Sequence, residues 1–264
     1  MNKVRIDQLV YDRGFAESRE RAKAIVMSGA VFVDGQKADK PGMAVSPLCE
    51  LEVRGDPIKY VSRGGLKLEK ALSVFSVNAH GKRCIDCGAS TGGFTDVLLR
   101  NGAEHVYAVD VGYGQLAWKL RQDKRVTNLE RCNLRYLTNE QIPEILDLAV
   151  MDVSFISIRL ILPVIRQFLK PTADCICLIK PQFEAGREQV GKKGVVRDAS
   201  VHCNVIESCI AAAREIGYSV MGLDYSPIKG PEGNIEFLCH LANAPLPEPN
   251  LNISAVVDSA HRVM

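Results

Sequence analysis

Three charged side chains end or interrupt apolar runs, where they could do acid–base chemistry. They are Asp152 in "LDLAVMDVSF", Lys180 in "CICLIKPQF" and Glu236 in "GNIEFL", and Lys67 in "SRGGLKLEKAL" would complete a set of two lysines and two carboxylates. A buried charge is costly unless it is paired, so two lysines and two carboxylates at one sheet edge would form a compensated polar site. The alternative is that they are separate strand ends that face solvent.

A glycine-rich stretch, "DCGASTGGFTDVLL" at 86–99, indicates a ligand site. Gly88, Gly92 and Gly93 would let the backbone turn tightly after a strand and let a ligand approach the start of a helix. Asp110 ends the later apolar run "HVYAVD", where its carboxylate could accept both hydroxyls of a ribose. The glycines alone could serve a plain turn, but with Asp110 they predict a nucleoside cofactor.

NAD and S-adenosylmethionine (SAM) both carry an adenosine, and the spacing favours SAM. The glycines follow G-x-x-x-G-G rather than the G-x-G-x-x-G of NAD-binding loops. The carboxylate of Asp86 would attract the amino-acid ammonium of SAM, whereas it would repel the pyrophosphate of NAD. Asn133 could contact the adenine edge or serve as a turn residue. The segment "MDVSFIS" lacks the Asp/Asn-Pro-Pro-aromatic motif of amino methyltransferases and the cysteine of cytosine-C5 enzymes.

Two structural units must position these residues. Residues 1 to about 55 predict two short helices, "RIDQLVYDRGF" and "SRERAKAIVMSGA" with Ser18 as cap, and a hairpin, "VFVDGQKA", that turns at Asp34–Gly35. The remainder alternates apolar strands with helical stretches, which predicts an α/β, doubly wound parallel sheet with ligands beyond the carboxyl ends of its strands.

The first unit carries a candidate RNA-binding face. Arg19 and Lys23 lie four residues apart on one helix and could meet successive phosphates. The same face could draw on the other basic residues of this unit, which are Arg5, Arg13 and Arg21. The alternative is a solvated helix whose basic side chains balance Glu17 and Glu20.

Composition narrows the class of protein. The 264 residues carry a net charge of +2, so a nucleic acid would be met by local basic clusters. The longest apolar run, 148–165, contains Asp152, Arg159 and Pro163, so no membrane span is expected. With no secretory segment at the start, we expect a cytoplasmic protein with reduced thiols. Cys84 and Cys87 form a C-x-x-C without a second pair, so no metal site is predicted.

Two resemblances to known families accompany these patterns. "ESRERAKAIVMSGAVFVDGQKADKPGMAV" is similar to the S4 domain, a module that binds structured RNA. Over the whole chain, "VSRGGLKLEKAL", "DCGASTGGFTDVLL", "VDVGYGQLAWKLR", "DVSFIS", "IKPQFE" and "GPEGNIEF" resemble the TlyA family. That family joins an S4 domain to an FtsJ-like ribosomal RNA 2′-O-methyltransferase and is often labelled haemolysin.

The resemblance implies a domain plan and a SAM site. It implies an S4 domain at 1–57, a linker at 58–63, a Rossmann-like methyltransferase domain at 64–245 and a helical tail at 246–264, where Ser254 could cap the helix. It makes Lys67, Asp152, Lys180 and Glu236 a catalytic tetrad. The implied cofactor-binding residues are Gly88, Ala89, Ser90, Thr91, Gly92, Gly93, Phe94, Asp110 and Asn234. Asp86 and Asn133 join this set from their positions in the sequence. The family has a shorter form, associated with the large ribosomal subunit, and a longer form with extra terminal residues that modifies both subunits. The tail at 246–264 therefore favours the longer form, which modifies both subunits.

The resemblance also suggests how RNA would be handled. A ribose 2′-hydroxyl must be aligned and helped to lose its proton, a role for which we favour Lys180. Phe155 could stack on a flipped-out base or belong to the core. Apart from the resemblance, basic residues that include Arg187, Lys192 and Lys193 outnumber acidic ones in the loop "FEAGREQVGKKGVVRD". We expect this loop to be a mobile flap that grips phosphates, and the alternative is an ordinary solvated loop. Competing hypotheses are an RNA-binding ribosome-assembly factor and a membrane-active haemolysin; the oligomeric state is not predicted.

Overall fold

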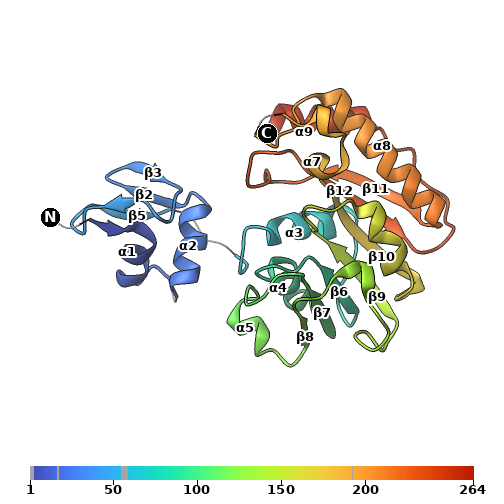
Figure 1. Ribbon diagram of the computed structural model, residues 1–264, viewed down its shortest axis with the longest axis horizontal. Helices are drawn as coiled ribbons and strands as arrows, with labels where there is room; N and C mark the ends of the chain where they lie inside the picture. Colours follow the sequence, from blue (N-terminus) through green and yellow to red (C-terminus); the bar gives the residue numbers. More distant parts are fainter. Residues whose placement is uncertain (1–2, 17, 55–58, 192) are drawn as a thin grey trace. The chain divides into compact units, whose positions relative to one another are not determined.

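The computed structural model describes residues 3–16, 18–54, 59–191 and 193–264. Contacts within the chain divide it into two compact units, Met1–Gly65 and Leu66–Met264. The division falls at the start of helix α3 (Gly65–Val74), which is drawn in Figure 1 next to the central sheet of the second unit.

The first unit is a small α/β module with its own core. Its elements are β1 (Val4–Arg5), α1 (Ile6–Asp12), α2 (Arg19–Met27), β2 (Val31–Val33), β3 (Gln36–Ala38), β4 (Ala44–Val45) and β5 (Leu51–Val53). Ser18 caps α2 by accepting from the Arg21 N–H, as predicted. Asp34 and Gly35 both have positive φ, 50° and 77°, which confirms the predicted hairpin turn. Apolar residues of both helices meet the strands in one cluster.

The second unit is built on a seven-stranded sheet in the order β11-β12-β10-β9-β6-β7-β8 (Figure 1). The strands are β6 (Arg83–Cys87), β7 (His105–Val109), β8 (Val126–Leu129), β9 (Leu146–Met151), β10 (Leu169–Ile179), β11 (Ser219–Tyr225) and β12 (Phe237–Ala242). The strands from β10 to β8 pair in parallel, but β12 is antiparallel to both of its neighbours. The predicted doubly wound parallel sheet is confirmed, with β12 as the antiparallel strand in it. Because β12 runs the other way, its first residues reach the edge where β6, β7, β9 and β10 end.

Helices cover both faces of this sheet. One face packs against α6 (Leu162–Arg166), α8 (Ala199–Ile216) and α9 (Ile253–Val263) through a single apolar cluster. On the other face, the Thr95 hydroxyl of α4 (Gly93–Arg100) donates a hydrogen bond to Asp86 of β6. The ring of Phe75, just after α3, stacks on the ring of His240 of β12. Short turns complete the unit: α5 (Trp118–Arg121), η1 (Leu134–Tyr136), η2 (Ile158–Leu160), α7 (Pro181–Glu184) and η3 (Arg187–Gln189).

The final helix, α9, packs against the rest of the second unit. Val257 and Ala260 are buried, and Figure 1 draws α9 beside α8. Its cap is Asn252, whose side chain accepts from the Ala255 N–H at 3.0 Å. The prediction that Ser254 caps this helix was wrong, because Ser254 lies inside the first turn and its hydroxyl donates to Asn252 Oδ1.

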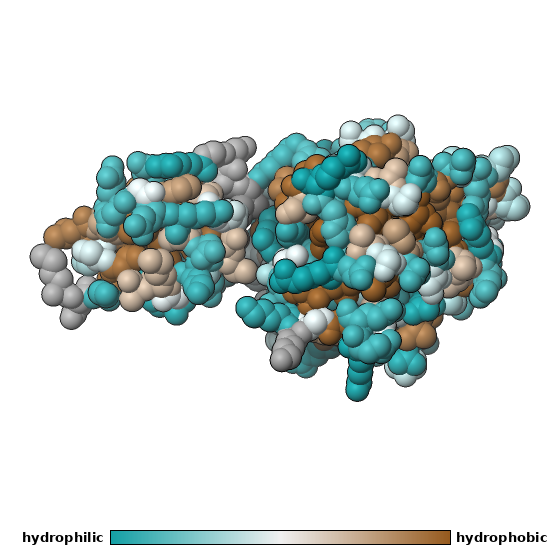
Figure 2. Space-filling model, turned by 90° about the horizontal axis from the view of Figure 1, so that it is seen from above, coloured by the Kyte–Doolittle hydropathy of each residue, from teal (hydrophilic) through white to brown (hydrophobic). Residues whose placement is uncertain are grey.

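The surface is mixed in character. On the face seen in Figure 2, hydrophilic side chains are interspersed with hydrophobic ones. Among the helices within the described ranges, none combines the length and the apolar character that crossing a bilayer requires. All nine cysteines are free thiols, and eight of them are buried.

Candidate active site

The four predicted charged residues converge into one cluster, here called the tetrad. Lys67 lies in the first turn of α3, Asp152 follows β9, Lys180 follows β10, and Glu236 precedes β12. Lys67 Nζ lies 3.2 Å from Asp152 Oδ2 and 2.6 Å from Glu236 Oε2. Lys180 Nζ lies 2.6 Å from Asp152 Oδ1. The four side chains therefore form a continuous chain of ion pairs, and the alternative of separate solvent-facing strand ends is wrong.

The charges of the tetrad stabilise one another. Burial would lower the pKa of Lys67, but the Asp152 and Glu236 carboxylates outweigh it and raise that pKa. Burial would raise the pKa of Asp152, but Lys67 and Lys180 outweigh it and lower that pKa. Asp152 has the most accessible side chain of the four, at 18%, so the cluster opens to solvent at its centre.

Two further residues shape the tetrad and were missed from the sequence. Ser154 Oγ accepts from Lys180 Nζ at 3.0 Å, which fixes the direction of this amine. Gly230 approaches so closely that a Cβ there would lie 2.7 Å from Glu236 Oε1. Ser154 lies in the segment "DVSFIS", and Gly230 begins the segment "GPEGNIEF". The sequence signal for Ser154 was a polar residue two positions after Asp152.

The glycine loop runs directly beside the tetrad. Gly88 has φ 86°, and a Cβ there would lie 3.0 Å from the backbone oxygen of Asp152. Gly92, with φ 92°, stands at the N-cap of α4, and Gly93 begins that helix. Ala89 and Phe94 are buried, whereas Ser90 and Thr91 are exposed. The loop thus presents backbone and a helix start at the edge of the sheet that carries the tetrad.

Asp86 has the properties expected of a ligand for an ammonium group. Its Oδ2 accepts from the backbone N–H and the hydroxyl of Thr95, at 2.9 and 2.7 Å. Its Oδ1 is buried and has no hydrogen-bond partner among the described residues. Burial raises the pKa of Asp86 to about 7. An unpartnered carboxylate oxygen and a neighbouring loop with three glycines fit the amino-acid end of SAM. Thr95 was missed, although it follows the glycines in the same motif.

Asp110 is held in place by the same loop. Its Oδ2 accepts from the Ser90 N–H at 2.8 Å, and its Oδ1 accepts from the Gly112 N–H at 2.6 Å. Each oxygen retains a lone pair that a ribose hydroxyl could use. Asn133 is exposed and caps η1 by accepting from the Arg135 N–H, which is the turn role left open by the sequence.

Asn234 is buried near the tetrad, but its amide binds the loop before α8. Its Oδ1 accepts from the Val196 N–H at 3.0 Å, and its Nδ2 donates to the Gly194 carbonyl at 2.8 Å. The end of the expected flap is therefore tied down. Arg187 and Lys193 of that flap are exposed, and Lys192 lies outside the described residues.

Phe155, three residues after Asp152, is exposed. Its side chain is 91% exposed, so it is not a core residue. Its backbone has φ 63°, a conformation that non-glycine residues rarely adopt. Its ring lies 5.1 Å from the ring of Phe183, whose own ring is 5.9 Å from Lys180 Nζ. An aromatic surface thus begins next to the tetrad.

The basic residues of the first unit are partly engaged with that unit itself. Arg5 donates two hydrogen bonds to the buried Asp7 carboxylate, which also lies 3.7 Å from Arg19 Nε. Arg13 and Arg21 donate to backbone carbonyls of Pro47 and Tyr60. The amine of Lys23 belongs to an exposed side chain on α2.

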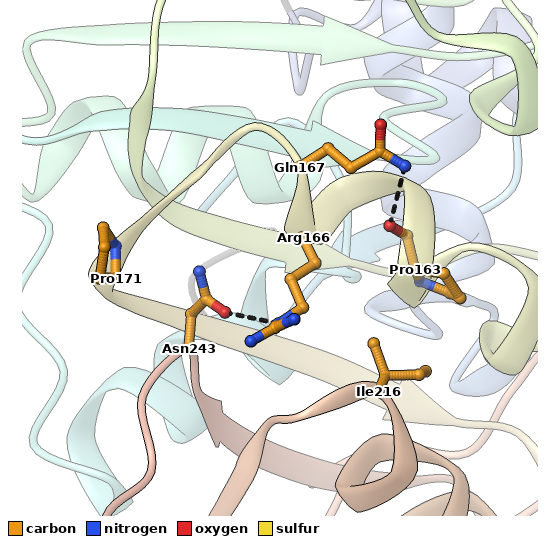
Figure 3. A pocket seen from close by; sticks show the side chains of 6 residues that line it. All are labelled: Pro163, Arg166, Gln167, Pro171, Ile216 and Asn243. Carbon is orange, nitrogen blue, oxygen red and sulfur yellow. Dashed lines mark hydrogen bonds between the residues drawn. The ribbon is translucent and has the colours of Figure 1, made fainter.

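A separate hollow lies at the opposite edge of the sheet and is not part of this site. Figure 3 shows its lining, in which Arg166 Nε donates to Asn243 Oδ1 at 2.8 Å. Asn243 follows the end of β12, whereas Glu236 precedes its start. Within the described part of the chain, no three His, Cys, Asp or Glu side chains are grouped so that they could hold a metal ion.

The fold and the site define a Rossmann-like methyltransferase. The family model described as FtsJ-like methyltransferase matches residues 60–243, and the S4 domain model matches residues 4–47. The chain belongs to the FtsJ-like methyltransferase family, within the TlyA group that carries an N-terminal S4 domain.

Individual relatives cover almost the whole chain. The proposed rRNA methyltransferase YqxC of Bacillus subtilis is 52% identical, covering 99% of this chain and 95% of that protein. The 16S/23S rRNA (cytidine-2′-O)-methyltransferase TlyA of Mycobacterium tuberculosis is 44% identical, with 99% and 97% covered. The solved structure of a proposed hemolysin from Streptococcus thermophilus is 50% identical, with a TM-score of 0.80 and 100% and 97% covered.

Proposed function

We propose that this methyltransferase uses SAM to methylate the ribose 2′-hydroxyl of cytidine in 16S and 23S ribosomal RNA. The observation that carries the proposal is the ion-paired tetrad directly beside the glycine loop. The name of the M. tuberculosis relative supports the substrate. The proposed site of action is the cytoplasm, where ribosomal RNA is found.

The residues proposed to hold SAM are those of the glycine loop with Asp86 and Asp110. Asp86 Oδ1 would bind the ammonium, Asp110 the ribose hydroxyls, and the backbone from Gly88 to Gly93 would line the cofactor. When bound, SAM supplies a methyl group already activated on a sulfonium. We assign Asn133 and Asn234 to the rim of this site, where their amides hold the surrounding loops.

The proposed work of the tetrad is to orient the attacking oxygen. Lys180 would donate a hydrogen bond to the 2′-oxygen and hold it in line with the methyl group. As the new C–O bond forms, the hydroxyl proton would pass to water at the solvent-accessible side of the cluster. Asp152 and Ser154 fix the Lys180 amine from two sides. Lys67 and Lys180 keep Asp152 ionised, and Glu236 balances the remaining charge of Lys67. Alignment in a partly buried, preorganised site is the main source of rate enhancement that this geometry supports.

The proposed RNA path uses exposed aromatic and basic side chains. Phe155 would stack on the flipped-out cytosine, with Phe183 behind it. Arg187, Lys192 and Lys193 would contact the backbone of the same RNA. The S4 unit would bind structured RNA through Arg5, Arg13, Arg19, Arg21 and Lys23, which gives affinity that depends on salt.

The proposal is tested by incubating the intact protein with labelled SAM and separated ribosomal subunits from cells that lack this enzyme. Label in both 16S and 23S RNA is expected. Label in neither, with SAM binding shown by calorimetry, would favour an RNA-binding assembly factor over an enzyme. Label in 23S RNA only would contradict the part of the proposal that concerns the small subunit.

A further inference from the structure

The loop before α8 is anchored through the backbone of one residue, Val196. We call residues 186–197, apart from Lys192, the basic loop. The N–H of the buried Val196 donates to Asn234 Oδ1, at 3.0 Å. Its carbonyl lies 3.2 Å from Nε2 of His202, a completely buried side chain in the first turn of α8. Because a carbonyl can only accept, His202 Nε2 carries the hydrogen. Both backbone groups of Val196 are thus held.

His202 is held in turn by the final helix. Its Nδ1 lies 2.9 Å from Nε2 of His261 in α9. With Nε2 protonated, Nδ1 of neutral His202 is an acceptor, so His261 donates to it from Nε2. Burial, together with the neighbouring His261, lowers the pKa of His202, which favours this neutral form. The His202 ring also packs edge-on against Phe237, the residue after Glu236, at 5.4 Å.

These contacts form one path from α9 to the basic loop. It runs from His261 to His202, to Val196, and to Asn234, which also holds Gly194. Among the described residues, neither histidine forms a hydrogen bond or an ion pair with the tetrad, so a direct role in methyl transfer does not explain them. The anchoring of α9 by Val257 and Ala260 does not need a donor at position 261.

We propose that His202 and His261 are positioning residues that hold the basic loop in the form that binds RNA phosphates. Helix α9 thereby acts on substrate affinity through two side chains that do not touch the substrate. The proposal rests on the proposed RNA-methylating function and adds a residue-level role for the end of the chain. It predicts that the pair affects binding of RNA but not binding of SAM.

The test compares His261→Ala with His261→Gln in the full-length protein. Losing one hydrogen bond from the path should raise KM for ribosomal subunits by about three- to tenfold, with kcat and the Kd for SAM unchanged. Trypsin should cut faster after Arg187, Lys193 and Arg197. His261→Gln keeps an N–H donor and should recover most of both effects. Arg262→Ala removes the adjacent cation without touching His202 and should behave as wild type.

The outcomes separate this proposal from the proposed function. Unchanged KM and unchanged cleavage in His261→Ala would overturn it, as would a loss of SAM affinity in step with RNA affinity. A His261→Gln variant no better than His261→Ala would also overturn it, because the donor would then be irrelevant. If wild-type protein methylates no ribosomal RNA, the proposed function fails, whereas the cleavage rates still decide whether the histidines hold the loop.

Discussion

Lys67 Nζ lies 2.6 Å from Glu236 Oε2, although the two residues are 169 positions apart in the chain. The antiparallel direction of β12 brings Glu236 to the sheet edge at which α3 begins. Both side chains are buried, so neither charge can replace its partner with water. This contact ties the first helix of the methyltransferase unit to its last strand.

The first prediction follows from that contact. Glu236→Ala leaves Lys67 with one carboxylate in a buried place, so it should lower the free energy of unfolding by about 3 kcal/mol. The double variant Lys67→Met/Glu236→Leu should cost less than the sum of its single changes. Denaturant unfolding measures both, with the exposed pair residue Glu52→Ala as control. Additive costs would mean that the two charges do not depend on each other.

A second prediction separates chemistry from cofactor binding. Lys180→Ala should abolish methyl transfer and leave the Kd for SAM nearly unchanged, because Lys180 is proposed to face the hydroxyl. Asp110→Ala should instead weaken SAM binding. Calorimetry and methyl transfer at saturating SAM measure the two effects, with Lys170→Ala at the opposite sheet edge as control. Loss of SAM binding in Lys180→Ala with transfer retained would reverse the assignment.

The third prediction uses the raised pKa of Asp86, about 7. An aspartate whose folded-state pKa exceeds its ordinary value of about 4 loses stability as the pH rises between those values. The unliganded protein should therefore lose a few kcal/mol between about pH 4 and 7 that Asp86→Asn does not lose. Unfolding curves of the two proteins at several pH values measure the difference. Parallel pH profiles would show that Asp86 is ionised throughout.

The affinity for SAM should depend on the same titration of Asp86. Ionisation of Asp86 lowers the stability of the unliganded protein, but it should strengthen the binding of SAM. An ammonium beside Asp86 favours its ionised form, so wild-type affinity for SAM should increase as the pH rises from about 5.5 to 7. Asp86→Asn should bind more weakly and with little pH dependence in that range. Calorimetric Kd values at each pH test this, and an equally steep profile in Asp86→Asn would assign the titration to another group.

The fourth prediction concerns the S4 unit. Arg5 and Arg19 pair with the buried Asp7, so reversing their charge would disturb the unit as well as RNA binding. Lys23→Glu on the exposed face of α2 avoids this problem. It should raise KM for ribosomal subunits and reduce the salt dependence by about one unit of log–log slope. Glu20→Gln on the same helix is the matched control. An unchanged slope would exclude a phosphate contact by Lys23.

Much of the local structure could be predicted from the sequence because it depends on local chemistry. Ser18 precedes an amphipathic stretch, a pattern that favours a helix N-cap. Asp34–Gly35 lies between apolar residues, a pattern that favours a hairpin turn. Ser254 failed as a cap because Asn252, two residues earlier, offered a competing side-chain acceptor to the same helix start.

The site was harder to predict where it depends on strand direction. An apolar run such as "FLCHLA" is compatible with a parallel or an antiparallel strand, so the reversal of β12 was not visible. Asp152, Lys180 and Glu236 were still identified, because charged residues that flank apolar runs need partners. Lys67 and the assignment of the four as a tetrad came with the family resemblance. The bonds of Asn234 and the pair formed by His202 and His261 join distant segments, and no local pattern indicates them.

The most direct test of the account is nucleoside analysis of the reaction product. Ribosomal subunits that lack the modification are methylated with labelled SAM by wild-type protein and by Lys180→Ala, and the RNA is digested to nucleosides and resolved by mass spectrometry. The account predicts label in 2′-O-methylcytidine with wild type and none with Lys180→Ala. Label in a base-methylated nucleoside, or equal 2′-O-methylcytidine from both proteins, would contradict it.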